Sequence, residues 1–171
     1  MAITRSNRPL ATKKIEAAAR RLLDASPLCA IATVTRSGRA HVNTAYFAWS
    51  PYLHLVWLSE PRATHSRNLR SNSSVAIAVY DSRQTWGKPD RGIQLFGRGR
   101  EAPPEADEVY ANRFPDFRSS DFEAYRLYEL VPRRLKLFDE RELGAATFVT
   151  ARVAADGRLT WERTEIYRSG S

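Results

Sequence analysis

The first apolar pattern in the chain has the spacing of an amphipathic helix. Five apolar residues recur at intervals of three and four: Ile15, Ala18, Ala19, Leu22 and Leu23. This spacing places them on one face of a helix. We expect that helix to begin at Thr12, as its N-cap, and to end near residue 25, because Pro27 follows. Residues 1–11 show no such period and are predicted to form a flexible N-terminal arm.

Short runs rich in β-branched and aromatic residues follow, and such runs are typical of strands. The predicted strands are residues 28–35, 39–49, 52–58, 75–80, 93–101 and 126–138, the last interrupted or bent at Pro132. Residues 147–153 and 158–167 flank Asp156-Gly157, which suits a hairpin turn. Helices are predicted at 60–69 and 105–112, with a short one near 120–125 and a long loop over 81–92. The successive hairpins favour one mainly β domain over residues 12–171, an antiparallel barrel with flanking helices.

Composition narrows the class of protein. The chain has 171 residues, 43% hydrophobic and 27% charged, as expected for one globular domain. No apolar run approaches the ~20 residues that a membrane-spanning helix needs, and no signal peptide is recognisable. Cys29 stands alone, so it cannot form an intrachain disulfide, and its apolar strand favours a buried, inert thiol. We expect a cytoplasmic protein with no membrane association.

The chain is basic, with a formal net charge of +8. Of its 27 basic residues 23 are Arg, a residue suited to bidentate contacts with phosphate, although biased codon usage also produces such an excess. Binding of nucleic acid would call for a continuous basic stripe interleaved with aromatic side chains. The Arg residues are instead scattered through every predicted element, so nucleic acid ranks last among the expected partners.

Polar chemistry concentrates between Leu58 and Asn68, where a predicted strand gives way to a predicted helix. This segment contains His65, two Arg residues and three hydroxyl side chains. A helix N-terminus offers free backbone N–H groups and a partial positive charge, so the segment suits a phosphate group. The alternative is a solvated surface helix. His41, His54 and His65 lie far apart in sequence, and we expect no shared metal site.

Two further features are open to a functional or a structural interpretation. Aromatic residues cluster around the second and third predicted strands and the long loop, where they either pack in the core or stack on a planar ligand: Tyr46, Phe47, Trp49, Tyr52, Trp57 and Trp86. Gly97 and Gly99 interrupt the fifth predicted strand. They indicate a bulge or a close approach of another backbone rather than a phosphate loop.

The order and spacing of five segments resembles one known family. The segments are residues 29–43, 55–59, 64–69, 72–77 and 91–99, and the similarity extends over about 28–138. Together they are similar to the pyridoxamine 5′-phosphate oxidase-like, flavin-binding split barrels. The resemblance implies a six-stranded antiparallel split β-barrel, a homodimer with flavin sites at the subunit interface, and FMN as the cofactor of an oxidoreductase acting on a small molecule.

The resemblance also implies which residues hold the cofactor. Asn43, Thr44, Ala45 and Tyr46 would lie along the ring, and Leu58 and Ser59 would touch it from the end of the third strand. Thr64, His65 and Arg67 would bind the phosphate, and Gln94 or Gly92 would reach the ring from the fifth strand. It implies no metal ligand and identifies no catalytic side chain.

The sequence departs from the true oxidases at three places. Asn43 and Ala48 stand where those enzymes have Arg and Lys, and Thr64-His65 replaces an Arg-Lys pair. Residues 144–147 replace a basic, His-containing motif that binds the substrate phosphate. We therefore expect a divergent member that does not oxidise pyridoxine phosphates. A deazaflavin-dependent reductase on the same fold, a heme-binding relative and a protein that binds a cofactor without catalysis remain as alternatives.

Overall fold

Strands are the main secondary structure in the computed structural model, which describes residues 2–6 and 9–168. The chain divides into two compact units. Unit 1 consists of Met1–Ser26, Ala78–Leu95 and Arg133–Ser171, and unit 2 of Pro27–Ile77 and Phe96–Pro132. Three strands, β5, β6 and β7, contribute residues to both units. The expected single domain over residues 12–171 stays a prediction.

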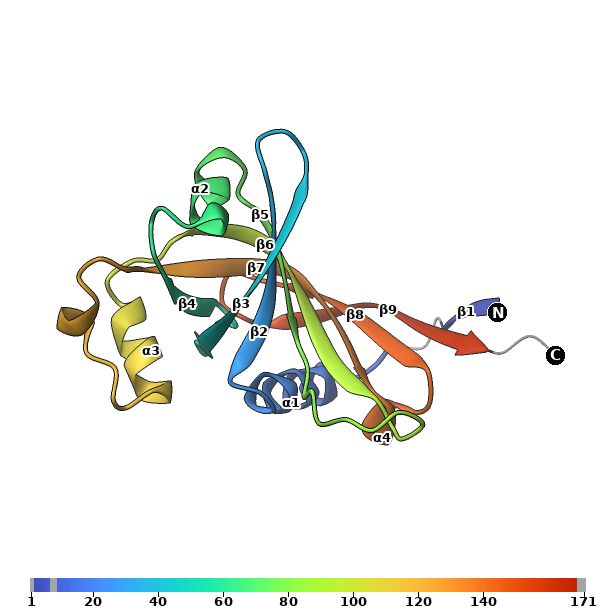
Figure 1. The fold of residues 1–171 in the computed structure, drawn as a ribbon. Coiled ribbons are helices and arrows are strands. Elements are labelled where there is room, and N and C mark those ends of the chain that lie inside the picture. Colours follow the sequence, from blue (N-terminus) through green and yellow to red (C-terminus); the bar gives the residue numbers. More distant parts are fainter. Residues whose placement is uncertain (1, 7–8, 169–171) are drawn as a thin grey trace. The chain divides into compact units, whose positions relative to one another are not determined.

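Most of the barrel belongs to unit 2. The hairpin of β2 (Leu28–Val34) and β3 (Ala40–Trp49) is extended by β4 (Leu55–Ser59), which pairs with the first part of β7 (Arg126–Asp139). On its other side β2 neighbours β5 (Ser74–Val79), which is followed by β6 (Arg91–Glu101), and β6 pairs back with β7. This order closes a ring of six strands (Figure 1). The predicted antiparallel barrel with flanking helices is therefore confirmed.

Glycines allow β6 to run against its neighbours in unit 2. A Cβ atom on Gly97 would lie only 2.1 Å from the carbonyl oxygen of Val131 on β7. A Cβ atom on Gly99 would lie 2.7 Å from side-chain carbons of Leu69 and Val75. No larger side chain fits either place without a shift of its neighbours, so the predicted close approach of another backbone is confirmed at Gly97.

Two helices and a 3₁₀ turn complete unit 2: α2 (Thr64–Ser71), α3 (Ala106–Arg113) and η1 (Ser119–Phe122). Asn68 anchors α2 to β2, because its side-chain amide donates a hydrogen bond of 3.0 Å to the Thr33 hydroxyl. The α3 helix packs on β3 and β4 through a buried apolar cluster: Ala48, Val56, Ala106, Tyr110, Phe117 and Leu127. Both helices thus cover strands that carry predicted site residues (Figure 1).

Unit 1 is built from α1 (Thr12–Asp24), β1 (Ala2–Ser6), the second part of β7, α4 (Glu140–Leu143), β8 (Thr147–Val153) and β9 (Leu159–Arg168). The apolar face predicted for α1 is buried, which confirms the helix. Ala11 rather than Thr12 is its N-cap, because Lys14 N–H already donates to the Ala11 carbonyl at 2.9 Å. The predicted C-terminal hairpin is confirmed by the antiparallel pairing of β8 with β9.

The N-terminal segment differs from the predicted flexible arm. Residues 2–6 form β1, which pairs antiparallel with β9, from Ala2 opposite Arg168 to Ser6 opposite Thr164. Backbone hydrogen bonds between the two strands stabilise β1, and no apolar pattern within residues 1–11 indicates this pairing. Residues 1, 7 and 8 of the predicted arm lie outside the described residues.

Several elements also differ from the sequence predictions. The β4 strand begins at Leu55, because residues 50–54 form a turn closed by a 2.8 Å bond from Leu53 N–H to the Ser50 carbonyl. The α2 helix begins at Thr64, because residues 60–63 form a turn in which the Ala63 N–H donates to the Glu60 carbonyl at 3.0 Å. The β7 strand passes through Pro132 without interruption, and α4 was not predicted. No helix within the described residues is long and apolar enough to span a membrane.

Candidate functional site

The start of α2 is tied to the end of β4 by a small hydrogen-bond network. The hydroxyl of Ser59, the last residue of β4, shares a hydrogen bond of 2.5 Å with Nε2 of His65, the second residue of α2. Ser66 Oγ donates to Ser59 Oγ at 3.2 Å, and Ser59 and Ser66 are both buried. When the Ser59 hydroxyl donates to Nε2, the imidazole proton resides on Nδ1, where it can be donated to a ligand.

A second histidine stands beside His65. The rings of His41 on β3 and His65 are stacked with their centroids 6.3 Å apart and an angle of 13° between their planes. Burial lowers the pKa of His65 below its usual 6.5, and the charge of His41 lowers it further. His65 is therefore mainly neutral at pH 7. His54, by contrast, has a structural partner, because its Nδ1 lies 3.2 Å from Oε2 of the buried Glu129.

The α2 helix begins without a side-chain cap. Its N-cap residue is Ala63, and no side chain of the described residues forms the capping hydrogen bond. The first backbone N–H groups of a helix have no partner within the helix. Thr64 and His65 are half-buried in this first turn, while Arg67 is exposed. The turn can therefore offer backbone N–H donors to an anion, as the sequence predicted. The Ser59 hydroxyl holds the His65 side chain in place, whereas the Arg67 side chain is exposed.

The pleat of β3 distributes the predicted ring-binding residues over its two faces. Asn43 and Ala45 are half-buried, while Thr44 and Tyr46 between and after them are exposed. The Oδ1 atom of Asn43 is buried and has no hydrogen-bond partner among the described residues. A buried acceptor without a donor is unusual in a folded protein and suits a site that a ligand completes.

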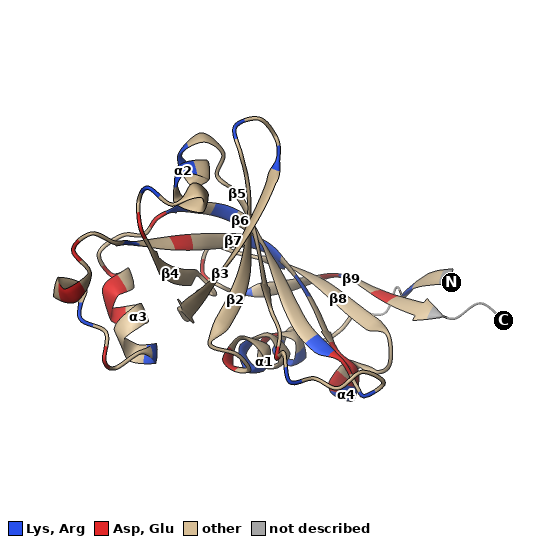
Figure 2. Cartoon of the chain, in the orientation of Figure 1, with Lys and Arg blue, Asp and Glu red and all other residues tan. Residues whose placement is uncertain are grey.

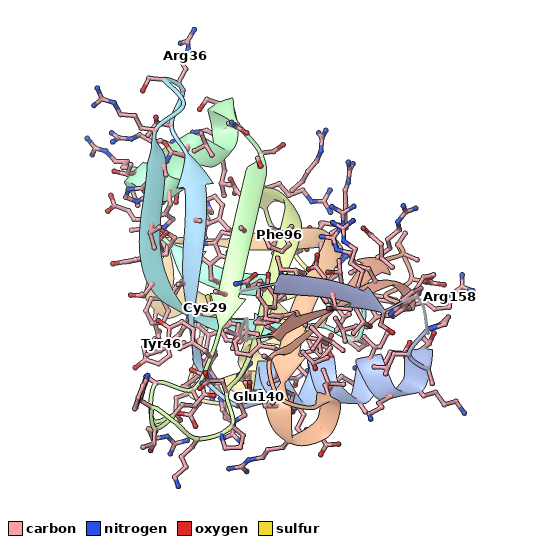
Figure 3. All side chains as sticks on the ribbon, turned by 90° about the vertical axis from the view of Figure 1, so that its right-hand side faces the viewer. Cys29, Arg36, Tyr46, Phe96, Glu140 and Arg158 are labelled. Atoms are coloured by element: carbon pink, nitrogen blue, oxygen red, sulfur yellow. The ribbon has the colours of Figure 1, made fainter. Side chains whose placement is uncertain are left out.

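A pocket of about 520 Å³ lies in unit 2 beside β3 and β4. It is lined by Thr44, Ala45, Tyr46, Leu58, Tyr110, Phe114, Asp116, Phe117 and Phe122. Four of these are predicted cofactor-binding residues, and the volume is within the ~300–1,000 Å³ range of small-molecule sites. Tyr46 lies toward the end of the β2–β3 hairpin opposite the turn that holds Arg36 (Figure 3).

Aromatic rings form the far wall of this pocket. The Phe114 ring lies edge-on to the Tyr46 ring, with 5.9 Å between the centroids, and is tilted against the Tyr110 ring at 4.8 Å. The Phe117 and Phe122 rings are stacked, with 5.6 Å between their centroids. Burial, aided by Cys29 and Tyr46, raises the pKa of Tyr110 to about 12, so its hydroxyl stays protonated at neutral pH. Sequence reasoning missed this wall. No helical spacing could have revealed it, because α3 ends at Arg113, before Phe114 and Phe117.

The remaining candidates fall outside these two clusters. Gln94 is exposed on the part of β6 that belongs to unit 1, and its role in the flavin site stays a prediction. Phe47 and Trp57 are buried core residues, and Trp86 is 97% exposed in unit 1. Cys29 is buried, as expected, and burial raises its pKa to about 12.

Basic residues are spread over helices, strands and turns alike (Figure 2). Several are paired with carboxylates, for example Arg134 with Glu162 at 3.1 Å and Arg163 with Glu165 at 3.4 Å. This distribution agrees with the scatter seen in the sequence and gives no support to a nucleic-acid surface.

The sequence matches the family model described as pyridoxamine 5′-phosphate oxidase over residues 15–139. This range contains every predicted cofactor-binding residue. No functionally curated protein matches the chain in sequence.

Solved structures share the fold at low sequence identity. A heme binding protein from Mycobacterium smegmatis has 16% identity and a TM-score of 0.65, with 89% of this chain and 62% of that one covered. An FAD-binding protein from Mesorhizobium loti has 16% identity and a TM-score of 0.59, with 81% and 99% covered. A protein from Clostridium acetobutylicum related to a general stress protein, of the pyridoxinephosphate oxidase family, has 11% identity and a TM-score of 0.61, with 84% and 97% covered. These likenesses confirm the predicted split-barrel fold.

Proposed function

The chain belongs to the pyridoxamine 5′-phosphate oxidase-like family, and from this we propose that it is an FMN-binding oxidoreductase that acts on a small molecule. The observation that carries the proposal is the pocket of about 520 Å³ beside β3 and β4, whose lining includes Thr44, Ala45, Tyr46 and Leu58. Proteins of this fold include one described as FAD-binding and one described as heme binding. The choice between flavin and heme therefore rests on the chemistry of the residues.

The residues at the ring end fit a flavin. The isoalloxazine ring is planar, and the pocket offers it aromatic and apolar surfaces, whereas Asn43, whose buried Oδ1 is unsatisfied within the described residues, is not part of the pocket lining. The rings of Tyr46 and Phe114 can pack against a planar ligand, since aromatic rings favour stacked and edge-on contacts. Leu58 supplies an apolar contact in the same lining.

The residues at the phosphate end also fit. His65 can donate from Nδ1 while its Nε2 is held by Ser59, and the uncapped first turn of α2 adds backbone N–H donors. Since His65 is mainly neutral at pH 7, it supplies a hydrogen bond more than a full charge. The loss of the Arg and Lys residues usual in the family predicts weaker FMN binding than in the true oxidases.

Bound FMN would supply the redox chemistry by accepting or donating a hydride. The chain's own residues bind the cofactor, orient it and exclude water from one side of its ring. Tyr110 stays protonated at neutral pH and can donate a hydrogen bond into the pocket, but it does not act there as a base. The substrate is a small molecule that reaches the exposed side of the pocket.

The experiment that tests this proposal identifies the cofactor directly. The protein is purified without added cofactor, its visible spectrum is recorded, and any released compound is identified by mass spectrometry. We expect a flavin spectrum and the mass of FMN. Release of a deazaflavin would favour the deazaflavin-dependent reductase instead, and release of heme would contradict the proposal.

We further propose a homodimer in the cytoplasm, with the second copy seated on the β2–β3 hairpin. Leu28 is 44% exposed, Val42 62% and Tyr46 56%, although all three are large apolar or aromatic side chains. Leu28 and Tyr46 lie opposite each other in the hairpin. Exposed apolar groups of this kind mark interaction surfaces. Light scattering at micromolar concentration with FMN present should give twice the chain mass of 19.4 kDa, and a monomer would refute the proposal.

A further inference from the structure

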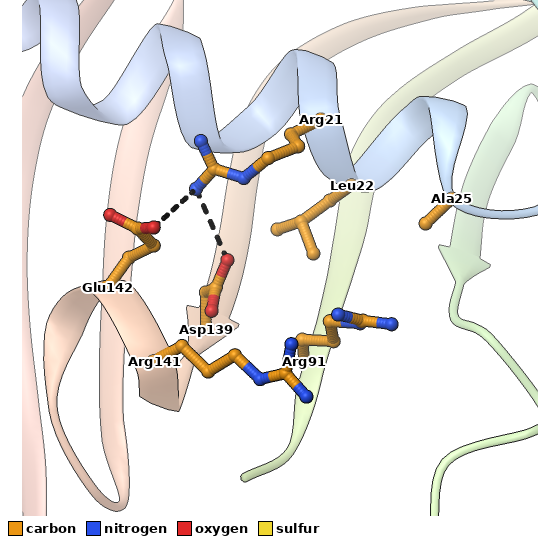
Figure 4. A pocket seen from close by; sticks show the side chains of 7 residues that line it. All are labelled: Arg21, Leu22, Ala25, Arg91, Asp139, Arg141 and Glu142. Atoms are coloured by element: carbon orange, nitrogen blue, oxygen red, sulfur yellow. Dashed lines mark hydrogen bonds and ion pairs between the residues drawn. The ribbon is translucent and has the colours of Figure 1, made fainter.

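A second pocket, of about 290 Å³, lies within unit 1 between α1, the start of β6 and α4. Three guanidinium groups line it, from Arg21, Arg91 and Arg141, together with the carboxylates of Asp139 and Glu142 (Figure 4). Its volume is at the lower end of the ~300–1,000 Å³ usual for ligand sites. The pocket therefore suits a small charged ligand.

Two polar atoms of this pocket are buried and unsatisfied. Asp139 is only 3% exposed, and while its Oδ2 accepts a hydrogen bond of 3.3 Å from Arg21, its Oδ1 has no partner in the part of the chain that the structure describes. The Nε–H of Arg91 likewise finds no acceptor within residues 2–6 and 9–168. Buried groups of this kind are nearly always hydrogen-bonded. The pocket thus presents one acceptor and one donor to whatever occupies it.

The long loop before β6 holds Arg91 in place. The Arg91 backbone N–H donates to the Gln84 side chain at 2.6 Å, and an Arg91 guanidinium nitrogen lies 3.7 Å from Asp81 Oδ2. On the α4 side of the pocket, the Glu140 carboxylate accepts hydrogen bonds from the Asp90 N–H at 3.0 Å and from the Ala146 N–H at 2.7 Å. These bonds fix the loop to the start of β6 and to α4, two of the three elements around the pocket. The site is thus built by the fold and not by free surface side chains.

Positive charge continues from the pocket into the loop. A neighbouring hollow shares Arg91 and Arg141 with it and adds Arg83 and Lys88, together with the carboxylate of Asp81, which pairs with Arg83 at 3.0 Å. An anion that approaches this side of unit 1 therefore meets several cations before it reaches Asp139. A fully deprotonated anion would still be repelled by the Asp139 carboxylate at the bottom.

We propose that this pocket binds a monoprotonated phosphate group, either as inorganic phosphate or as the end of a small phosphomonoester. The phosphate oxygens accept hydrogen bonds from Arg91 and Arg141, which suits the guanidinium fork. The phosphate hydroxyl donates to Oδ1 of Asp139. This arrangement satisfies both unpaired atoms at once and explains why a carboxylate lies among three arginines.

Sulfate provides the sharpest test of this arrangement. It has nearly the size and shape of phosphate, but it carries no proton at neutral pH and would place an oxygen against Asp139. The full chain is titrated calorimetrically at pH 7 and constant ionic strength with inorganic phosphate, with glycerol 3-phosphate and with sulfate. We expect one of the two phosphates to bind at least ~10-fold more tightly than sulfate, the effect of one charged hydrogen bond. Which phosphate binds more tightly identifies the source.

Variants assign the binding to this pocket. Arg91→Gln should weaken phosphate binding roughly 10-fold or more, and Arg141→Gln, at an exposed position of α4, should weaken it without affecting the fold. Asp139→Asn replaces the acceptor by an amide that can donate, so it should abolish or reverse the preference for phosphate over sulfate. Arg158→Gln, in the exposed β8–β9 turn outside the lining, removes the same charge and should leave binding unchanged.

The result is independent of the flavin proposal, because His65 does not line this pocket. His65→Ala should leave phosphate binding to this pocket unchanged. The proposal is overturned if neither phosphate binds, if sulfate binds as tightly as phosphate, or if His65→Ala abolishes the binding while Arg91→Gln and Arg141→Gln do not.

Discussion

Ser59 Oγ and His65 Nε2 share a hydrogen bond of 2.5 Å, so the last residue of β4 fixes the imidazole ring at the start of α2. The Ser66 hydroxyl supports this contact from the next position of the helix, at 3.2 Å from Ser59. The ring is thus held by one nitrogen, and the other nitrogen remains for a ligand. The predictions for the phosphate end of the flavin site rest on this contact.

Replacing His65 should separate the binding of the phosphate from the binding of the ring. A hydrogen bond to a charged group contributes ~1.5–3 kcal/mol, so His65→Ala should raise the Kd for FMN roughly 10- to 150-fold at pH 7.5. Riboflavin, which lacks the phosphate, should bind equally well to the variant and the native protein. Fluorescence titrations with both ligands measure this. If His65→Ala weakens both ligands alike, or neither, the phosphate assignment is wrong.

The lowered pKa of His65 predicts a dependence of stability on pH. The unfolded chain takes up a proton at this residue near pH 6.5, before the folded chain does, because burial and His41 lower the pKa of His65 in the folded state. Its contribution to stability is therefore complete above pH 6.5 and is lost as the pH falls through the folded pKa.

Urea unfolding of the native protein and of His65→Gln between pH 8 and pH 5 isolates this contribution. The free energy of unfolding of the native protein should fall more steeply toward acid than that of the variant. Parallel curves for the two proteins would show that His65 has an ordinary pKa in the folded chain.

Tyr46 should contribute to binding of the flavin ring and not to binding of the phosphate. It lines the pocket and meets Phe114 at 5.9 Å, and aromatic contacts of this kind contribute ~0.5–1.5 kcal/mol. Tyr46→Ala should weaken FMN and riboflavin by the same factor, about 2- to 12-fold. Tyr52 is a matched control, because it is 54% exposed against 56% for Tyr46 but does not line the pocket. Equal losses in Tyr46→Ala and Tyr52→Ala would contradict the pocket assignment.

Local patterns predicted those elements whose stabilising contacts are local. The five-residue apolar stripe of α1 and the β2–β3 hairpin were each located to within about a residue or two, because periodicity and turn residues determine them. The β1 strand was missed for the opposite reason. Its ladder partner β9 lies at the other end of the chain, so no neighbouring residue indicates the pairing.

The same distinction applies to the candidate site. The first turn of α2 could be predicted, because a strand end and a helix start adjoin in sequence. The stacking of His41 on His65 and the wall of Tyr110, Phe114 and Phe117 could not be, since they depend on how β3, α2 and α3 pack. The loop before β6 was recognised only as too long for a turn, and its bonds to Glu140 became visible in the fold.

The chain is proposed to bind FMN in the pocket beside β3 and β4. The most direct test of this proposal is the titration of cofactor-free protein with FMN, with a deazaflavin and with heme, each followed by its own absorbance or fluorescence. We predict saturable binding of one FMN per chain, with a Kd in the micromolar range or weaker because the family's Arg and Lys residues are replaced. Tight binding of heme without any binding of FMN would contradict the account.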